Sequence, residues 1–218
     1  MPPETRAEPS YLFFLRHGET EWNRQRRIMG DMDIPLSARG REQCQGMAAL
    51  LDGFGIARIR SSPLLRARQT AEVMAQALGL PVEYDEGLVE VRFGEWQGKT
   101  YDEIFGDPRF HSFVADPVAH PTPGGETIAD VQARGLASAG NVAAGDRILM
   151  VSHGDIIRSV LCHYMSIPLS EFRRIRVDNC GLAAVSVTGD VAVAQFVNLL
   201  ADVTRVLEPV HWDRTPQK

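Results

Sequence analysis

The sequence predicts an α/β fold in which a mainly parallel central sheet carries helices on both faces. Three observations support this prediction. Short apolar runs, typical of strands buried on both faces, alternate with longer segments of helical periodicity. Two of these runs, Tyr11–Leu15 and residues 148–151, are each followed within two residues by a His-Gly pair. Near the C-terminus, residues 182–187 and 191–197 flank a Thr-Gly-Asp turn and indicate an antiparallel hairpin at the sheet edge. We therefore expect a three-layer α/β/α sandwich.

Length and composition fit one ordinary globular domain. The chain has 218 residues, of which 44% are hydrophobic and 23% charged. The net charge of −5 argues against nucleic acid or an anionic membrane surface as a partner. Residues 1–10 lack the apolar centre of a signal peptide, and no apolar run is long enough to span a bilayer. We expect one cytoplasmic domain over residues 11–207, with loose tails at 1–10 and 208–218, and leave a homodimer open.

The three cysteines, Cys44, Cys162 and Cys180, give no sign of a disulfide framework. They lack metal-ligand spacing and cannot pair evenly. Such usage is typical of a protein in a reducing compartment.

The expected elements follow from local signals taken in order. Ser37 can cap a helix that continues to Gly53, and residues 55–61 form a weaker strand. Ser62 is predicted to cap the next helix, with Pro63 as its first residue and Gly79 at its end. The remaining predicted elements are a short strand at 82–84, a short helix opened by a capping box at Thr100, a helix from Thr127 toward Ala144, a strand at 147–152 and an amphipathic helix after it.

Residues 86–125 are expected to form a lid over the sheet. Residues 107–125 are rich in proline and glycine, which indicates an irregular excursion of functional length. Earlier in the same stretch, Glu90 lies between two valines, an environment that would raise its pKa toward that of a general acid. The alternative for Glu90 is an ordinary glutamate on an edge strand.

Charged and titratable side chains follow the predicted strands. Arg16 and His17 come directly after the first strand, and His153 follows a later one. Arg66 lies in the first turn of a helix, where amide groups and the helix dipole favour anions. Because ligands bind at the carboxyl ends of strands in open α/β sheets, these residues could converge on one cleft. Histidine nucleophile, arginines and a carboxylic acid form a set suited to phosphoryl transfer.

Several segments of the chain resemble those of a known family. Its segments Arg16-His-Gly-Glu-Thr20 with Trp22-Asn23, Ser62-Pro-Leu-Leu-Arg66, Glu90 before Phe93-Gly94, and Ser152-His-Gly154 resemble the motifs of the histidine phosphatase superfamily, in its phosphoglycerate-mutase-like branch. The match extends from about Tyr11 to Phe196. Glu90-Val-Arg-Phe-Gly94 and Pro123-Gly-Gly-Glu126 are most similar to the broad-specificity and α-ribazole-phosphate phosphatases.

The resemblance implies a role for each matched residue. His17 would be the phosphorylated nucleophile, and Glu90 the proton donor that later activates water. The phosphoryl group and substrate would be held by Arg16, Thr20, Asn23, Gly30, Arg66, His153 and Gly154, together with His17 and Glu90 themselves. Met29 stands where many relatives carry glutamine before the glycine, which affects one expected contact. The implied activity is metal-independent hydrolysis of small phosphate monoesters, without a cofactor. Because the sequence shows no extra basic cluster, we expect a small or aromatic phosphomonoester with no strict need for a second anionic group.

Three alternatives remain. His17, His153, Glu19 and Asp155 could be metal ligands, although no zinc spacing is present and nearby arginine is repulsive to a cation. A phospho-ligand binding module without chemistry would need a missing catalytic residue, and none is missing. A cofactor-dependent phosphoglycerate mutase, or a phosphatase specific for α-ribazole phosphate, would share the same motifs.

Overall fold

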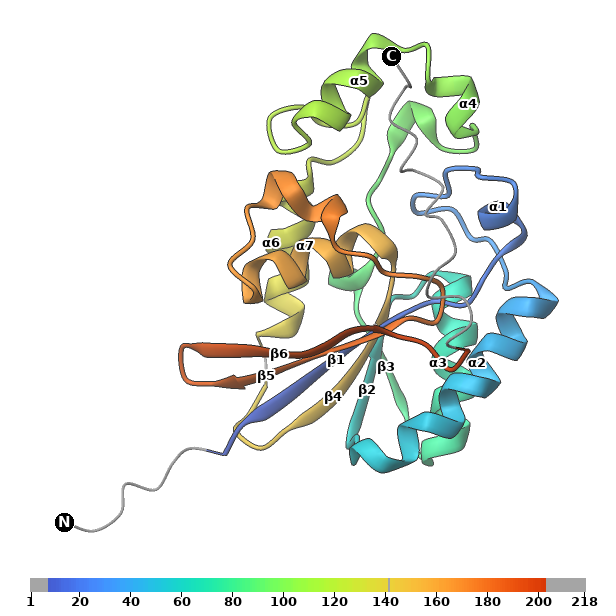
Figure 1. Cartoon of the computed structure of the whole chain (residues 1–218). Coiled ribbons are helices and arrows are strands. Elements are labelled where there is room, and N and C mark those ends of the chain that lie inside the picture. Colours follow the sequence, from blue (N-terminus) through green and yellow to red (C-terminus); the bar gives the residue numbers. More distant parts are fainter. Residues whose placement is uncertain (1–7, 141, 203–218) are drawn as a thin grey trace.

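A six-stranded sheet forms the centre of the computed structural model, which describes residues 8–140 and 142–202 (Figure 1). Its strands are β1 (Ser10–Arg16), β2 (Arg58–Ser61), β3 (Val82–Tyr84), β4 (Arg147–Ser152), β5 (Leu182–Thr188) and β6 (Val191–Leu199). Their spatial order is β3-β2-β4-β1-β5-β6. The first four strands of that order are parallel, whereas β5 and β6 pair antiparallel at one edge.

Helices cover both faces of this sheet. The α-helices are α1 (Glu21–Arg24), α2 (Ala38–Leu51), α3 (Leu65–Leu78), α4 (Tyr101–Ile104), α5 (Pro108–Ala115), α6 (Ile128–Ala139) and α7 (Gly154–Tyr164). Short 3-10 helices lie at η1 (Asp52–Phe54), η2 (Glu86–Leu88), η3 (Gly94–Trp96) and η4 (Leu169–Arg174). In Figure 1, α2 and α3 lie on one side of the sheet and α6 and α7 on the other. The predicted three-layer, mainly parallel sandwich is confirmed.

The apolar run of β1 explains how the two layers are held. Leu12 and Phe14 belong to the core beneath α6 and α7, whereas Phe13 and Leu15 belong to the core beneath α2 and α3. Successive side chains of a strand point to opposite faces, so an unbroken apolar run supplies both cores at once. β1 is therefore a central strand, and its carboxyl end lies deep within the molecule.

Local capping signals placed several helix ends correctly. The Ser37 side chain accepts a hydrogen bond from the Gly40 amide at the start of α2. Thr127 and Asp130 form a capping box at the start of α6. The predicted end of α6 near Ala144 is wrong, because the helix stops at Ala139 with glycine as the following residue. Glycine destabilises a helix interior and favours this termination.

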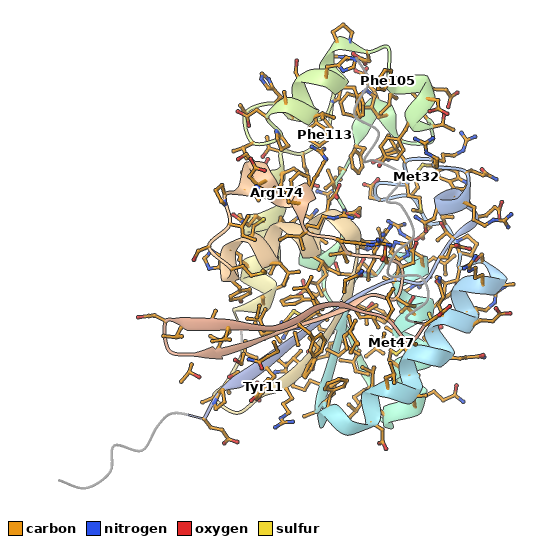
Figure 2. The ribbon with its side chains drawn as sticks, in the orientation of Figure 1. Tyr11, Met32, Met47, Phe105, Phe113 and Arg174 are labelled. Carbon is orange, nitrogen blue, oxygen red and sulfur yellow. The ribbon has the colours of Figure 1, made fainter. Side chains whose placement is uncertain are left out.

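The expected lid contains more regular structure than its composition indicates. It includes η2, η3, α4 and α5, and in Figure 1 α4 and α5 lie beyond the carboxyl ends of the parallel strands. The prediction of an irregular stretch is wrong for α5, because Asp107 caps this helix and Pro108 occupies its first turn. The Trp96 ring packs edge-on against Phe113 at 5.7 Å between centroids, and Figure 2 shows Phe113 inside the lid. The lid thus has an aromatic core of its own.

The predicted tails fall largely on residues 1–7 and 203–218, which lie outside the described part, although Ser10 already belongs to β1. Within the described residues, every helix is too short or too polar to cross a bilayer.

Candidate active site

The pairing of β1 with β4 brings the two motif histidines together. Arg16 lies opposite Ser152 in the register, and His17 and His153 are the next residues of the two strands. Their rings lie 5.2 Å apart between centroids, and both side chains are buried. The His17 amide also donates to the Ser152 carbonyl at 2.9 Å. Residues 136 positions apart in the sequence therefore form one site at the carboxyl end of the sheet.

His17 is held in a defined tautomer. Its Nδ1 lies 2.7 Å from the carbonyl oxygen of Gly18. A carbonyl oxygen can only accept, so Nδ1 carries the proton and Nε2 keeps its lone pair. Burial, the Arg66 guanidinium and the Arg16 guanidinium together lower the pKa of His17 well below its ordinary value. Nε2 is consequently an unprotonated nitrogen at neutral pH.

His153 is held by Ser62, which the sequence analysis assigned to helix capping. Its Nε2 lies 2.8 Å from the hydroxyl oxygen of Ser62. The prediction that Ser62 caps α3 is wrong: the helix begins at Leu65 without a side-chain cap. The Ser62 hydroxyl is instead engaged by His153 and by the Leu64 amide. Burial and Arg66 lower the pKa of His153 well below its ordinary value.

Arg66 reaches the site from the first turn of α3. Its two terminal nitrogens donate to the carbonyls of Met32 and Gly30, at 2.8 and 2.7 Å. Gly30 has φ of 53°, a left-handed conformation that glycine adopts without strain. Burial lowers the pKa of Arg66 to about 10. Gly30 therefore contributes its backbone, which orients an arginine that stays charged at neutral pH.

Arg16 is the second buried cation. Its Nη1 donates to the Val177 carbonyl at 2.8 Å. Burial and the neighbouring Arg158 lower the pKa of Arg16, whereas Glu90 acts in the opposite direction. Within the described part of the chain, Nε of Arg16, Nε of Arg66 and Nδ1 of His153 are buried without a hydrogen-bond partner. The two guanidinium groups among them are cationic donors of the kind that matches the oxygens of a phosphoryl group.

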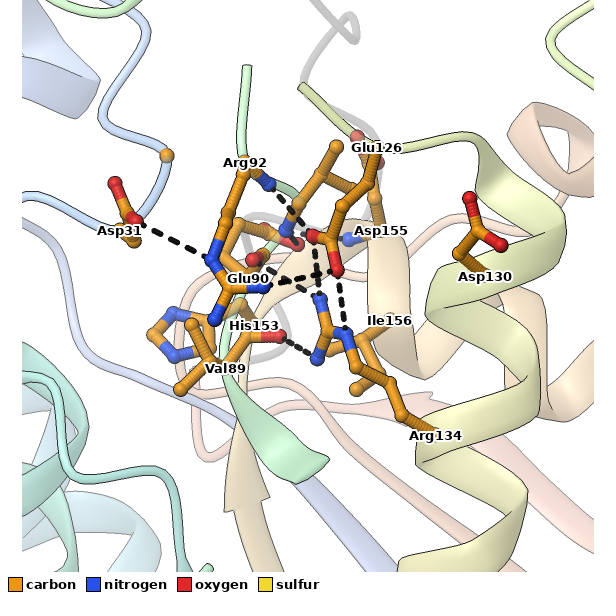
Figure 3. Close-up of polar contacts among 12 residues, drawn as sticks. Asp31, Val89, Glu90, Arg92, Glu126, Asp130, Arg134, His153, Asp155 and Ile156 are labelled. Atoms are coloured by element: carbon orange, nitrogen blue, oxygen red, sulfur yellow. Dashed lines mark hydrogen bonds and ion pairs between the residues drawn. The ribbon is translucent and has the colours of Figure 1, made fainter. Parts of the chain in front are cut away.

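Glu90 lies in the same field of charges, near the start of α7 (Figure 3). Its carboxylate accepts from the Val91 amide at 3.1 Å and from the Asp155 amide at 3.4 Å. Burial and the negative charge of Asp155 raise the pKa of Glu90, while Arg66 and Arg16 oppose the shift. A carboxyl group with a raised pKa is suited to general acid catalysis.

Thr20 and Asn23 support each other at the start of α1. The Thr20 amide and hydroxyl both donate to Oδ1 of Asn23, at 2.9 and 3.1 Å. Oδ1 of Asn23 also accepts from the side chain of Asn179, which in turn donates to the His17 carbonyl. The oxygen of Asn23 is thus used internally, and its amide nitrogen is the group that it can offer to a ligand. Thr20 is buried as a capping residue, and its hydroxyl also contacts the sulfur of Met29 at 3.3 Å.

Gly154 is the first residue of α7 and directly follows His153. A side chain at this position would approach Arg158 and Arg16, at 3.0 and 3.6 Å from the added carbon. The amino end of α7 therefore lies beside two cations, and its dipole adds to their attraction for an anion.

An arginine that the sequence analysis missed holds the Glu90 segment in place (Figure 3). Arg134 of α6 forms a two-pronged ion pair with Glu126, with both N–O distances at 3.1 Å. The same guanidinium donates to the backbone carbonyls of Gly87, Val89 and Glu90. Glu126 in turn accepts from the Arg92 amide at 2.9 Å. In the sequence, the only signal for this network was the place of Glu126 in the Pro-Gly-Gly-Glu motif.

The set proposed as metal ligands gives no cation site. Within residues 8–140 and 142–202, no group of three or more His, Cys, Asp or Glu side chains is arranged to hold a metal ion. Asp155 instead pairs with Arg158 at 2.6 Å, and Glu19 lies 3.3 Å from the Ser37 hydroxyl.

Two neutral histidines, two arginines and a carboxyl group lie together at the carboxyl ends of parallel strands, an arrangement suited to phosphoryl chemistry. The comparisons with known proteins agree with this class. Residues 12–199 match the model of the histidine phosphatase superfamily, branch 1, and the chain belongs to that family.

Three relatives illustrate the family's range. An Escherichia coli O1:K1 protein named "Probable phosphoglycerate mutase GpmB" is 34% identical over 179 residues, covering 80% of this chain and 83% of its own. A phosphoserine phosphatase from Entamoeba histolytica, solved with 3-phosphoglyceric acid, has a TM-score of 0.80, 28% identity, and coverage of 87% and 97%. An Escherichia coli K-12 protein described as a "putative alpha-ribazole-5'-P phosphatase" has a TM-score of 0.79, 25% identity, and coverage of 87% and 96%.

Proposed function

We propose that this protein hydrolyses small phosphate monoesters through a phosphohistidine intermediate on His17. The Nε2 lone pair attacks phosphorus, the bond from phosphorus to the ester oxygen breaks, and Glu90 donates its proton to the departing alkoxide. Glu90, now a carboxylate, takes a proton from water as the water attacks phosphorus. The phosphorus–nitrogen bond then breaks, which releases inorganic phosphate and restores His17 and Glu90.

The observation that carries this proposal is the environment of His17. The Gly18 carbonyl holds Nδ1 as the proton donor, and burial together with two arginines keeps the ring neutral by lowering its pKa. The same positive charges attract the phosphate dianion and stabilise the negative charge that spreads over its oxygens during transfer. One arrangement thus supports both nucleophile and electrophile.

A further arginine, Arg173, supports a preference among substrates. The Arg173 guanidinium lies over the rings of Phe172 and Phe113, 4.8 Å from each centroid, and so joins η4 to the lid. Within the described residues Arg173 forms no ion pair. Burial lowers the pKa of Arg173, and the negative charge of Asp155 opposes this shift, so Arg173 lies within electrostatic reach of the start of α7. We therefore infer a preference for monoesters that carry a second acidic group, such as a carboxylate, over neutral ones.

The relative named as a phosphoglycerate mutase and the phosphatase solved with 3-phosphoglyceric acid favour the same substrate class. They also make mutase activity the second candidate function. An assay that follows phosphate release and the interconversion of phosphoglycerates in one reaction separates the two. Hydrolysis without isomerisation is expected, and isomerisation exceeding phosphate release would favour the mutase.

A trapping experiment tests the main proposal. The enzyme is mixed with radiolabelled phosphoserine or 3-phosphoglycerate, quenched in alkali, and the label is mapped by proteolysis. Wild-type enzyme should carry an acid-labile label on His17, and His17→Ala should lose both label and turnover. His163→Ala, which alters an exposed histidine of α7, is the matched control and should keep both. Turnover that persists in His17→Ala would overturn the proposal, and ligand binding without turnover in wild type would indicate a binding module.

A further inference from the structure

Two of the three cysteines lie in contact beside the turn formed by His17 and Gly18. The sulfur atoms of Cys44, in α2, and Cys180, before β5, are 3.5 Å apart, and both thiols are buried. They come from segments 136 residues apart in the chain. The uneven count of cysteines concealed this pair from sequence analysis.

Each member of the pair also contacts the segment that carries His17. The backbone amide of Cys180 donates to the carbonyls of Arg16 and His17, at 3.1 and 3.2 Å. On the other side, a Cβ atom added to Gly18 would lie 2.9 Å from the sulfur of Cys44. The turn between His17 and Gly18 is therefore packed directly on Cys44 and hydrogen-bonded to Cys180.

The contact extends to Arg66 through one threonine. The hydroxyl of Thr70 lies 3.6 Å from the sulfur of Cys44, accepts from the Gly18 amide at 3.1 Å and donates to the Arg66 carbonyl at 2.8 Å. A movement of Cys44 would thus reach both the nucleophile and the arginine beside it. The backbone of Cys180 has φ of 55°, a left-handed conformation that is strained for any residue but glycine and concentrates at functional positions.

We propose that Cys44 and Cys180 form an oxidisable site that hydrogen peroxide converts to a disulfide, and that this disulfide switches off the proposed phosphatase. One thiolate attacks a peroxide oxygen, breaking the oxygen–oxygen bond, releasing water and leaving a sulfenic acid. The partner thiol attacks that sulfur, expels a second water and closes the disulfide. Two thiols are oxidised by two electrons, and one peroxide is reduced to two waters.

The disulfide would change the geometry of the site. Its sulfurs must approach to about 2.05 Å, so they must close by roughly 1.5 Å through rotation of the two side chains and movement of the segments that carry them. Displacements of this size at a catalytic centre cost on the order of a hundredfold in rate. Because the His17 turn and Thr70 rest on the pair, this displacement falls on the nucleophile and on Arg66.

Cys162 provides an internal comparison. It is buried in α7 on the other face of the sheet, and burial raises its pKa to about 11. Hydrogen bonding with Cys180 and with Thr70 lowers the pKa of Cys44. The Cys44–Cys180 pair should therefore be oxidised before Cys162, at a rate limited by local opening of the packing.

The chemical part of the proposal is tested without any activity assay. Reduced full-length protein is treated with hydrogen peroxide over a time course, then denatured, and its remaining thiols are alkylated. Peptide mapping should show three alkylated cysteines before treatment and only Cys162 afterwards, with a Cys44–Cys180 disulfide peptide. Cys44→Ser and Cys180→Ser should each prevent this product, whereas Cys162→Ser should not. Retention of all three thiols, or a disulfide that includes Cys162, would overturn the assignment.

The functional part rests on the proposed phosphatase activity. Oxidised enzyme should lose kcat/KM by on the order of a hundredfold, and dithiothreitol should restore it. Each serine variant is compared with its own untreated sample, and both should resist the loss, whereas Cys162→Ser should lose activity as the wild type does. A mapped disulfide with unchanged activity would overturn the switch. Absence of phosphatase activity in the reduced enzyme would overturn the proposed function and leave the mapping result intact.

Discussion

In the proposed mechanism, Glu90 supplies a proton to the leaving group and later accepts one from water. Replacing it with glutamine removes the proton that an alkoxide leaving group requires, while p-nitrophenolate leaves without one. Glu90→Gln should slow alkyl phosphates by on the order of 10²–10⁴-fold. It should spare the first step with p-nitrophenyl phosphate and accumulate phosphoenzyme, because the water-activating carboxylate is also gone. Rapid-quench measurement of the burst checks this, and a wild-type rate on alkyl phosphates would place the acid elsewhere.

If the acid were not Glu90, Glu126 would be a further candidate, but its surroundings argue against a role as general acid. Its carboxylate is paired with Arg134 and accepts from the Arg92 amide. Both oxygens of its carboxylate therefore already accept hydrogen bonds from these two arginine residues.

The pH dependence should separate the same two residues. The productive form has His17 neutral, above its lowered pKa, and Glu90 protonated, below its raised pKa. For an alkyl phosphate, kcat/KM should therefore fall on the alkaline side as Glu90 loses its proton. For p-nitrophenyl phosphate the first step needs no acid, so this alkaline fall should be absent. Profiles measured on one enzyme preparation provide the comparison, and identical alkaline limbs would contradict the assignment.

At the scale of elements, Arg134 of α6 holds the segment that carries Glu90, the proposed general acid. Arg134→Met leaves the Glu126 carboxylate and three backbone carbonyls without this partner. We expect a loss of stability on the order of 2 kcal/mol and a lower kcat with little change in KM, because phosphate contacts remain. Urea unfolding and steady-state kinetics measure both. Arg109→Met, at an exposed lid ion pair, is the control and should change stability by under about 0.5 kcal/mol. Equal effects in the two variants would refute a positioning role for Arg134.

Arg173 provides a second prediction at this scale. Arg173→Leu keeps apolar contact with the two rings but removes the cation. KM for 3-phosphoglycerate should rise roughly tenfold, the equivalent of about 1.4 kcal/mol, whereas KM for p-nitrophenyl phosphate should change little. Arg174→Leu, the exposed neighbouring position labelled in Figure 2, is the control. Equal shifts for both substrates would show that Arg173 does not select for acidic groups.

For the whole molecule, burial of neutral histidines should make stability depend on pH. The pKa values of His17 and His153 are lowered in the folded state, so this contribution is complete above the unfolded value near 6.5 and is lost as pH falls below it. Each histidine should cost on the order of 1 kcal/mol between pH 7.5 and 5.5. Urea unfolding at the two pH values measures the loss, and His153→Gln should reduce it by about half of the combined histidine effect. An unchanged loss in that variant would show that His153 does not contribute.

Much of the fold could be predicted because its signals are local. The unbroken run of β1 and the capping residues Ser37 and Thr127 each lie within a few positions of the structure that they specify. α5 was missed although its cap, Asp107, is local, because the surrounding prolines and glycines indicated irregular chain. Ser62 was misassigned because a serine before proline is a good cap, and only the fold shows that its hydroxyl meets His153.

The candidate site divides in the same way. His17 and His153 stand between a strand end and a glycine, Arg66 follows a Ser-Pro helix start, and Glu90 lies between two valines, so local patterns indicate all four. Arg134 and Asn179 do not, because their partners are distant in sequence: Arg134 reaches Glu90 across 44 positions and Asn179 reaches His17 across 162. An arginine on an amphipathic helix has the same local pattern whether it faces water or a carboxylate.

The adjacency of β1 and β4 also bears on how the chain acquires its function. These strands pair residue for residue, from Tyr11 with Arg147 to Arg16 with Ser152, although about 136 positions separate them. Closing so long a loop must precede any reward from the contacts, and parallel pairing across such distances folds slowly. β2 and β3 must also find their places beside β4 before the sheet is complete. His17 meets His153 only once β1 and β4 have paired, so a partly folded chain in which this pairing is missing lacks the proposed site.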